Sequence, residues 1–537
     1  MSDTTQASAA QTVTRALAQS QTMASAEASD GCWVCQQQLW ISVFFDEPGH
    51  DAEKERGTER LSNIGKLLFA HAVEPKRGIY RLYYNGLGIG FKPASAVRSQ
   101  TAQEVAQKQT EDVLKDKAQE VLKDRSWKNL LHPKNWGADL LGLLAKVGLE
   151  SVDSVRDKPV VTQVTLSGVD TRINTALSEV DEIIASQSVP ITQLHVAVFG
   201  SGLGGAMARL FANRLQEKCK TPGQALWLPT AKGPVRMNIR FMGLLDCVSA
   251  QLNDVSLAGL AAGKLSLGMA TLRVQGPMGL TRHVQQAVHL VAGHEQRVTH
   301  RLDSIRKAQC PYTETLWPGT HSDVVGGMAN RVQGRSHELA RVPLIELYYA
   351  AYGAWVPVLP MAKLEKTSQM VYKDFQFTHK DDKGAGARSM VRQYGATSGS
   401  LEDQLTQHMA LYLSWLRLRY ETASHPQRPT QQVFDMLQEQ LRGLSRMASH
   451  PHTRASQLPD AHVRALLRAY QQGLPLSAAQ VTLFDFFVHD SLADSLLDQA
   501  ALDYGDNGYF KLRGIDASDE LQADEAAPVV PVSSRAS

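Results

Sequence analysis

The local pattern with most capacity for chemistry is a glycine-rich turn between an apolar run at residues 194–199 and an amphipathic stretch at 206–215. The turn reads Gly200-Ser201-Gly202-Leu203-Gly204-Gly205. Three of its glycines fit G-x-G-x-x-G, namely Gly200, Gly202 and Gly205. That pattern lets a backbone approach a pyrophosphate at a helix N-terminus. One interpretation is therefore a binding site for a dinucleotide such as NAD or FAD.

Dinucleotide binding also requires an acidic residue for the ribose, about 20 residues farther on. No Asp or Glu occurs from Lys218 to Leu245, so this remains a second alternative and we expect no bound dinucleotide. The turn also fits a degenerate nucleophile elbow, G-x-S-x-G, with glycine in the serine place at Gly202. Ser201 is the adjacent hydroxyl. A third interpretation is a strand–helix turn whose glycines only permit close packing.

The elements that would position these residues alternate along the chain. Runs rich in apolar, aromatic or β-branched residues, each ending in a polar or glycine-containing turn, predict strands at 39–45, 79–84, 194–199, 235–245 and 313–316. Periodic stretches predict helices at 61–69, 169–186, 206–215 and 284–300. This alternation indicates an α/β fold with a mainly parallel sheet. We expect a helical insertion at about 99–158 and a mostly helical part at 336–515.

Composition narrows the function classes. The chain has 537 residues, 43% of them hydrophobic, and a net charge of +2, which favours a globular protein without the basic field of nucleic-acid binders. Cys32 and Cys35 have a metal or redox spacing, but a second ligand pair is missing, so we predict no metal and no cofactor. Residues 1–36 lack a secretory h-region, and we expect a disordered leader there and a disordered tail at 516–537.

No apolar stretch is long enough for a membrane-spanning helix. We therefore expect a chain made in the cytoplasm, and any export would not use the general secretory route. The small apolar segment 255–280 is a buried loop in the simplest interpretation, and a lid or a peripheral membrane contact in another.

Several motifs together resemble one family, the α/β-hydrolase domain of type VI secretion phospholipase effectors, family 1. Its F-F-D-G-T strand end corresponds to Phe44-Phe45-Asp46, where Glu47-Pro48 depart from the pattern. Its elbow G-F-S-R-G-A corresponds to the glycine-rich turn, with Gly202 for Ser and Leu203 for Arg. Further similar segments, spread over about 38–515, are 62–64, 83–88, 208–213, 243–248, 289–297, 318–327, 488–491 and 508–510.

The resemblance implies an α/β-hydrolase fold and hydrolysis of phospholipid or other esters by a Ser-His-Asp triad. Carried over, Asp246 is the acid, His321 is the base, and Gly202 holds the nucleophile position. Asp46, Leu203 and Gly204 would line the pocket and the oxyanion site. Alternative catalytic residues are Ser201, His294, Asp323 and His489.

Each of these residues also has a structural interpretation. Asp246 could cap the following segment, His321-Ser322-Asp323 could stabilise a loop, and His489 beside Asp490 could be a structural pair. The resemblance further implies a secretion-spike carrier, an immunity protein, and delivery into a target cell as a toxin.

The departures cluster around the presumed site. Loss of a triad nucleophile costs about six decades of rate, and glycine cannot replace it. Two hypotheses follow. One is a lipase effector that uses another nucleophile, such as Ser201. The other is a catalytically inactive pseudo-hydrolase that keeps the fold for binding or interaction.

Overall fold

The computed structural model describes residues 37–87, 91, 167–222, 225–252, 271–274, 276–297, 300–380, 386–422, 424–449, 461–493 and 508–517. Five expectations lie wholly or mostly outside these residues: the leader, the Cys32–Cys35 pair, the insertion at 99–158, the segment 255–280 and the tail at 516–537. Among the described helices, none is both long enough and apolar enough to cross a bilayer.

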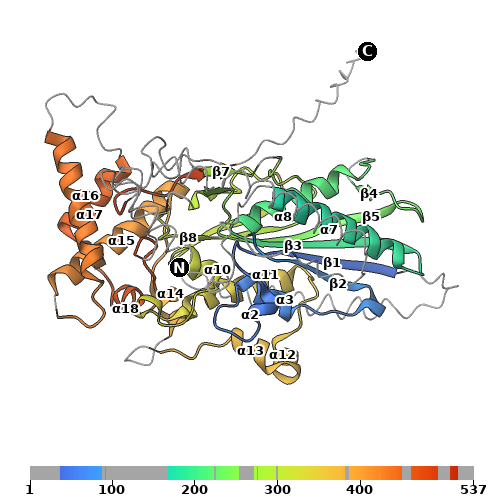
Figure 1. Cartoon of the computed structure of the whole chain (residues 1–537), viewed down its shortest axis with the longest axis horizontal. Helices are drawn as coiled ribbons and strands as arrows, with labels where there is room; N and C mark the ends of the chain where they lie inside the picture. The colour runs from blue at the N-terminus through green and yellow to red at the C-terminus, as the bar shows by residue number, and fades with distance from the viewer. Residues whose placement is uncertain are drawn as a thin grey trace, which may run out of the picture.

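A twisted sheet with the strand order β10-β8-β5-β3-β1-β2 forms the centre of the molecule (Figure 1). The neighbouring strands along this order pair in parallel, and β4 pairs antiparallel with β5. The strands are β1 (Gln37–Phe45), β2 (Ile79–Tyr84), β3 (Ile191–Ser201), β4 (Leu226–Leu228), β5 (Val235–Leu245), β8 (Ala287–Ala292) and β10 (Tyr312–Trp317). The predicted α/β class with a mainly parallel sheet is confirmed.

Helices cover both faces of this sheet (Figure 1). One face carries α7 (Ser167–Ser186) and α8 (Leu203–Glu217). The other carries α3 (Asn63–Ala70) and α11 (Arg341–Gly353), with the short α2 (Ala52–Glu55), α12 (Met361–Thr367) and α13 (Gln369–Asp374) beside them.

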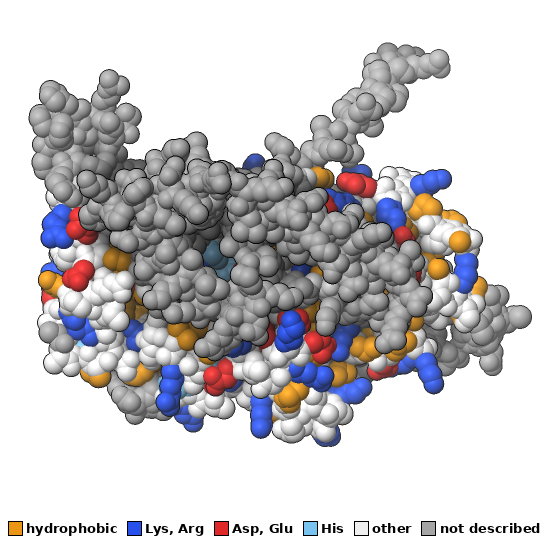
Figure 2. Space-filling view, in the orientation of Figure 1, with side chains coloured by type: hydrophobic (Ala, Val, Ile, Leu, Met, Phe, Trp, Pro, Cys, Tyr) orange, Lys and Arg blue, Asp and Glu red, His pale blue; other side chains and the backbone are white. Residues whose placement is uncertain are grey.

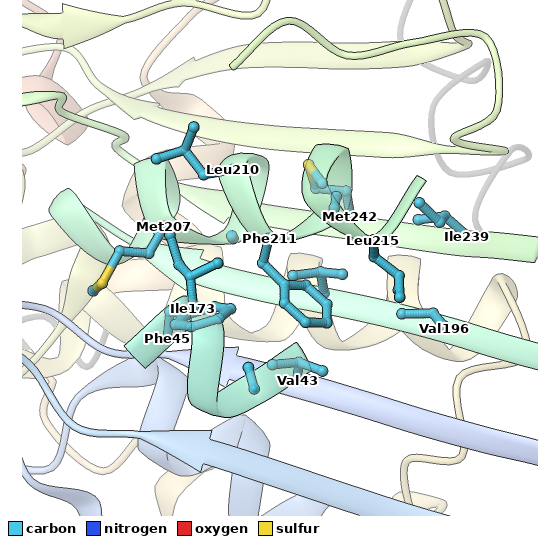
Figure 3. Packing of buried hydrophobic residues seen from close by; sticks show 14 of the residues in the cluster. Val43, Phe45, Ile173, Val196, Met207, Leu210, Phe211, Leu215, Ile239 and Met242 are labelled. Atoms are coloured by element: carbon cyan, nitrogen blue, oxygen red, sulfur yellow. The ribbon is translucent and has the colours of Figure 1, made fainter. Parts of the chain in front are cut away.

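Period-two side-chain alternation divides the core between these two faces. Val43 and Phe45 of β1 pack with residues of α7 and α8, as Figure 3 shows. Phe44, between them, belongs to the opposite cluster with α3 and α11. Strand β3 alternates in the same way, with Val198 on the α8 side and Phe199 on the other. A strand buried on both faces is expected to be continuously apolar, as residues 196–199 of β3 are.

The C-terminal part is helical, as predicted, and has its own core. It comprises α14 (Ala387–Gln393), α15 (Leu401–Glu421), α16 (Gln431–Ser449), α17 (Ala461–Gln472) and α18 (Ala478–Phe486). Asp485 of α18 is buried there and accepts hydrogen bonds from Trp415 Nε1 at 2.9 Å and Arg419 Nε at 2.8 Å. The last described residues return to the sheet domain, because β11 (Ile515–Asp516) pairs with β9 (Leu302–Asp303). A separate hairpin joins β6 (Ala250–Leu252) and β7 (Thr271–Arg273).

The predicted helix at 284–300 is wrong. This segment contains β8, which pairs with β5 on one side and β10 on the other. A short apolar run of this kind fits a buried strand as well as a helix, and its β-branched residues favour the strand. The correction matters for the site, because β8 lies between the two strands that precede Asp246 and His321.

Charged side chains are mixed in sign over the surface. On the coloured part of the face in Figure 2, Lys and Arg alternate with Asp and Glu, and no patch of a single sign stands out. This distribution agrees with the small net charge of the chain.

Candidate active site

The central strands end at one edge of the sheet and bring their following residues together. In the register, Phe45 of β1 lies opposite Gly200 of β3, which lies opposite Leu244 of β5. Residues directly after these strands therefore meet at the carboxyl edge, where parallel α/β sheets bind their ligands. Those residues are Asp46-Glu47, Gly202 and Asp246.

Gly202 forms the turn between β3 and α8. Its backbone has φ 49° and ψ −122°, a conformation that side-chain-bearing L residues adopt only with strain. Its N–H donates to Leu245 O at 2.9 Å and its carbonyl accepts from Val248 N at 3.1 Å, so β5 fixes the turn. A sharp, strained strand-to-helix turn is the geometry of a nucleophile elbow.

The other glycines of the turn permit close backbone contacts. A Cβ on Gly200 would lie 2.3 Å from Gly204 O, and one on Gly204 would lie 2.4 Å from Phe45 O. A Cβ on Gly205 would lie 2.0 Å from Cys247 Sγ. Packing therefore accounts for these three glycines without a bound phosphate.

Asp246 and His321 lie together at this edge. His321 is the first residue of α10 (His321–Val325), and its Nδ1 is 2.6 Å from Asp246 Oδ2. Asp246 also accepts a hydrogen bond from Ala292 N at 2.9 Å. The backbone N–H of His321 donates to Glu295 Oε2 at 3.1 Å, so Glu295 anchors the start of α10.

A residue far along the chain completes the surroundings of Asp246. Arg513 Nη1 lies 2.8 Å from Asp246 Oδ1 and 3.0 Å from Oδ2, and both side chains are fully buried. Burial by itself raises the pKa of Asp246, but the Arg513 charge and the His321 hydrogen bond outweigh it and lower that pKa. Asp246 is therefore an anion that holds the imidazole of His321.

The second ring nitrogen of His321 faces Glu47. His321 Nε2 lies 3.1 Å from Glu47 Oε1, while Glu47 Oε2 is buried and has no hydrogen-bond partner among the described residues. Burial lowers the pKa of His321, but the charges and hydrogen bonds of Glu47 and Asp246 outweigh it and raise the pKa to about 9. At neutral pH this imidazole is a cation between two carboxylates.

The Glu47 carboxylate lies against Gly202, in the space that a side chain at residue 202 would need. A Cβ added to Gly202 would lie 1.7 Å from Glu47 Oε2 and 2.5 Å from Cδ. Glu47 therefore fits here because residue 202 has no side chain. In the sequence, Glu47 shows only as a departure from the family pattern, without a role.

Asp46, expected to line the pocket, instead fixes the loop after β1. Its Oδ2 accepts from Ser62 Oγ at 2.9 Å and from Tyr83 Oη at 2.8 Å, and its Oδ1 accepts from Glu47 N at 2.9 Å. Burial raises its pKa although these groups lower it. Asp46 therefore positions the backbone of Glu47.

Ser201, the alternative nucleophile, is not hydrogen-bonded to His321. Its Oγ is buried and has no hydrogen-bond partner within the part of the chain that the structure describes, and both nitrogens of His321 are engaged by Asp246 and Glu47. Leu203 and Gly204 begin α8 and are buried. Their position beside Gly202 is the one expected for oxyanion donors in an elbow.

The remaining alternatives lie in other contacts. His294 accepts from Gly319 N at 2.8 Å through Nδ1, and its Nε2 is 3.2 Å from Tyr394 Oη. Asp323 caps α10, and its Oδ1 is 2.6 Å from His489 Nδ1. This second buried His–Asp pair is distinct from the Asp246–His321 pair.

The expected pairing of His489 with Asp490 is wrong. Asp490 instead accepts from Tyr412 Oη at 2.6 Å and Tyr509 Oη at 3.0 Å. Sequence adjacency misleads here because each side chain finds its partner in another segment of the chain.

Sequence reasoning missed Glu47, Glu295, His300 and Arg513 as members of this region. The signal for Arg513 was its closeness to Gly508-Tyr509-Phe510, a segment shared with the family pattern. Glu295 lies in the segment 289–297 that also carries the resemblance. No sequence signal distinguishes His300.

Part of the chain matches a known protein family. Residues 224–348 match the family model described as "T6SS, Phospholipase effector Tle1-like, catalytic domain". The matched range contains Asp246 and His321 and excludes Glu47 and Gly202. A search of curated proteins gave no match.

Two solved structures are similar. One is an uncharacterized protein from Pseudomonas aeruginosa, with 16% identity and a TM-score of 0.54, covering 95% of this chain and 82% of that chain. At this identity the similarity shows the fold alone. The other is the Tle1 effector bound to the VgrG spike of the Type 6 secretion system, with 15% identity, covering 71% of this chain and 87% of that chain. Its TM-score of 0.34 supports no structural conclusion.

Proposed function

We propose that this chain is a pseudo-hydrolase related to the Tle1-like phospholipase effectors, in which Glu47 has replaced the serine nucleophile. It keeps the elbow turn and the Asp246–His321 pair but does not hydrolyse lipid esters by a serine mechanism. The observation that carries the proposal is the position of the Glu47 carboxylate, 1.7 Å from where a Cβ of residue 202 would stand.

The charge state supports the same conclusion. A serine mechanism needs a neutral imidazole that accepts the hydroxyl proton at its outward nitrogen. Here that nitrogen faces Glu47 Oε1 at 3.1 Å, and the pKa of His321 is raised to about 9. Both the nucleophile and the free base are absent from the position where a substrate carbonyl would bind.

The same carboxylate disfavours the dinucleotide alternative. Glu47 lies at the N-terminal end of α8, where the helix dipole favours an anion and where a pyrophosphate would bind. A pyrophosphate would meet a buried negative charge there. We propose that the carboxylate serves as the internal anion of this helix end.

The proposed activity is therefore binding, with a phospholipid or another ester as the ligand class that the family match suggests. From the same match we expect a secretion-spike carrier and an immunity protein as partners, and delivery into a target cell.

Restoring a nucleophile tests the proposal. Hydrolysis of phospholipid vesicles and short-chain esters would be measured, with a metal chelator present, for wild type, Gly202→Ser and Gly202→Ser/Glu47→Gly. We expect no turnover from wild type or the single variant, because the new serine collides with Glu47. The double variant should gain turnover that disappears when His321→Ala is added.

The contrary result is a robust wild-type rate. If that rate is lost in Ser201→Ala, the nucleophile has moved by one residue and the serine mechanism persists. If it is insensitive to Ser201→Ala but lost in His321→Ala, the proposal of an inactive site is equally wrong.

A further inference from the structure

Three metal-binding side chains converge where the nucleophile is missing. Glu47, His300 and His321 each offer one ligand atom, and these atoms all lie within 4.8 Å of one another. Glu47 Oε1 and His321 Nε2 are 3.1 Å apart, and the rings of His300 and His321 have centroids 4.7 Å apart at 70°. The three residues come from the loop after β1, the loop before β9 and the start of α10.

The surroundings of His321 are those of a metal-binding histidine. Such histidines usually present one ring nitrogen to the metal and direct the other to a carboxylate, which fixes the orientation of the ring. His321 presents Nε2 to the cluster and places Nδ1 2.6 Å from Asp246 Oδ2. Asp246 is itself held by Arg513 Nη1 at 2.8 Å and by Ala292 N at 2.9 Å.

One buried oxygen of Glu47 favours the binding of a cation at this position. Glu47 Oε2 is buried and has no hydrogen-bond partner among the described residues, although its twin Oε1 contacts His321. A buried acceptor without a partner costs about 1–3 kcal/mol, and more when it is charged. A divalent ion beside Glu47 would satisfy this oxygen.

We propose that Glu47, His300 and His321 bind one divalent transition-metal ion, for which Zn²⁺ is the probe. Two imidazoles and one carboxylate, with a further position open, are a common zinc donor set. Zn–N and Zn–O bonds of about 2.0–2.1 Å put tetrahedral ligands about 3.4 Å apart. Glu47 and His321 already have nearly this spacing.

The donor set does not suit Ca²⁺ or Mg²⁺. Ca²⁺ and Mg²⁺ take oxygen ligands, and two of the three donors here are nitrogens. The inference rests on the proposed function in one respect, since Glu47 must hold the nucleophile position for the cluster to exist.

Binding to the full chain tests the inference directly. The purified protein, stripped with a chelator and dialysed, would be titrated with Zn²⁺ by calorimetry and with Co²⁺ by visible spectroscopy. We expect one ion per chain and the intense visible bands of four- or five-coordinate Co²⁺. Glu47→Gln and His300→Asn should lose this binding. Asp246→Asn, which removes the orienting carboxylate, should weaken it about 10- to 100-fold.

The control is His462→Asn on α17, a half-buried histidine whose Nδ1 lies 2.8 Å from Thr406 Oγ1, outside the cluster. It should bind like wild type, and circular dichroism would show that each variant is folded. Absence of stoichiometric binding in wild type would overturn the inference, as would binding that survives both Glu47→Gln and His300→Asn. Equal affinity for Ca²⁺ would also overturn it.

The two proposals fail separately. The hydrolysis assays contain chelator, so a wild-type rate there overturns the pseudo-hydrolase without bearing on the metal. Failure to bind Zn²⁺ or Co²⁺ leaves the hydrolysis results unchanged.

Discussion

At the scale of single residues, Glu47 and Gly202 fit together. Gly202 has a positive φ and no side chain, and the Glu47 carboxylate from the neighbouring strand end lies in the space that a Cβ there would need. In the proposed function this carboxylate changes what the base of the site faces. In a serine hydrolase the base faces a neutral hydroxyl, whereas here His321 faces an anion and retains its proton.

The charge of Glu47 should therefore control the titration of His321. In metal-free protein, Glu47→Gln should lower the pKa of His321 from about 9, measured by the imidazole resonances in NMR. A raised folded-state pKa stabilises the protein fully below the unfolded value of 6.5 and loses this effect as pH rises through 9. Wild type should thus lose about 3 kcal/mol of unfolding free energy between pH 6.5 and 9.

Glu47→Gln should lose much less over the same range, because less of the shift remains. Urea unfolding of both proteins at several pH values measures this. Parallel pH profiles for the two proteins would contradict the assigned contact.

At the scale of elements, helix α8 positions the elbow, and a buried ion pair holds α8 against β9. Arg209 Nη1 lies 3.1 Å from Asp303 Oδ1 of β9, and both side chains are fully buried. Arg209 Nε also donates to Met278 O at 2.6 Å. The pair joins the helix after Gly202 to the strand that pairs with the C-terminal segment.

Breaking this pair should be costly. Arg209→Met should lower the unfolding free energy by about 3–5 kcal/mol, because it leaves Asp303 as a buried carboxylate without its cation. Chemical denaturation measures the change. The matched control is Arg214→Met on the same helix, whose partner Asp170 is exposed, and it should cost at most about 1 kcal/mol. Equal losses in the two variants would remove the special role of Arg209.

Elements with one clear pattern could be predicted from the sequence, and contacts between distant elements could not. Strands β1, β2, β3, β5 and β10 can be predicted because each is rich in apolar, aromatic or β-branched residues and ends in a polar or glycine-containing turn. Strand β8 was missed because it is short and the residues around it extend the apolar pattern into a helical one. Its true neighbours follow from the sheet order, which local pattern does not contain.

The site shows the same division. The family resemblance implies Asp246 as the acid and His321 as the base, and the structure puts their side chains in contact. Glu47 could be seen to depart from a motif, but its fit against Gly202 depends on which strands are neighbours. Arg513 is 267 residues from Asp246 along the chain, and no local pattern could connect them.

At the scale of the whole molecule, the last described segment of the chain contacts the candidate active site. The segment 508–517 leaves the helical C-terminal part and reaches the sheet domain, where β11 pairs with β9. Arg301 and Asp516 form an ion pair there, with Nη2 and Oδ1 2.8 Å apart. Asp516 thus takes part in structure although the sequence suggested a tail from that residue onward. The site near β5 is assembled from both ends of the described chain.

Arg513 should therefore contribute more to the free energy of unfolding than any other contact of segment 508–517. Arg513→Met leaves Asp246 buried without its guanidinium, and we expect a loss of about 3–5 kcal/mol of unfolding free energy at pH 7. Arg301→Met, which breaks the partly exposed pair between Arg301 and Asp516 of the same segment, should cost at most about 1 kcal/mol.

The lowered pKa of Asp246 adds a pH dependence to this prediction. A depressed carboxyl pKa stabilises the fold above the unfolded value of 3.8 and loses that contribution as pH falls below it. Wild type should accordingly lose stability below about pH 4 more steeply than Arg513→Met, in which the Asp246 pKa is no longer held down. Urea unfolding of the three proteins between pH 3 and pH 7 separates these effects. If Arg513→Met is as stable as Arg301→Met at neutral pH, the C-terminal segment does not hold the acid of the site, and the burial of the Asp246 charge must be compensated from elsewhere.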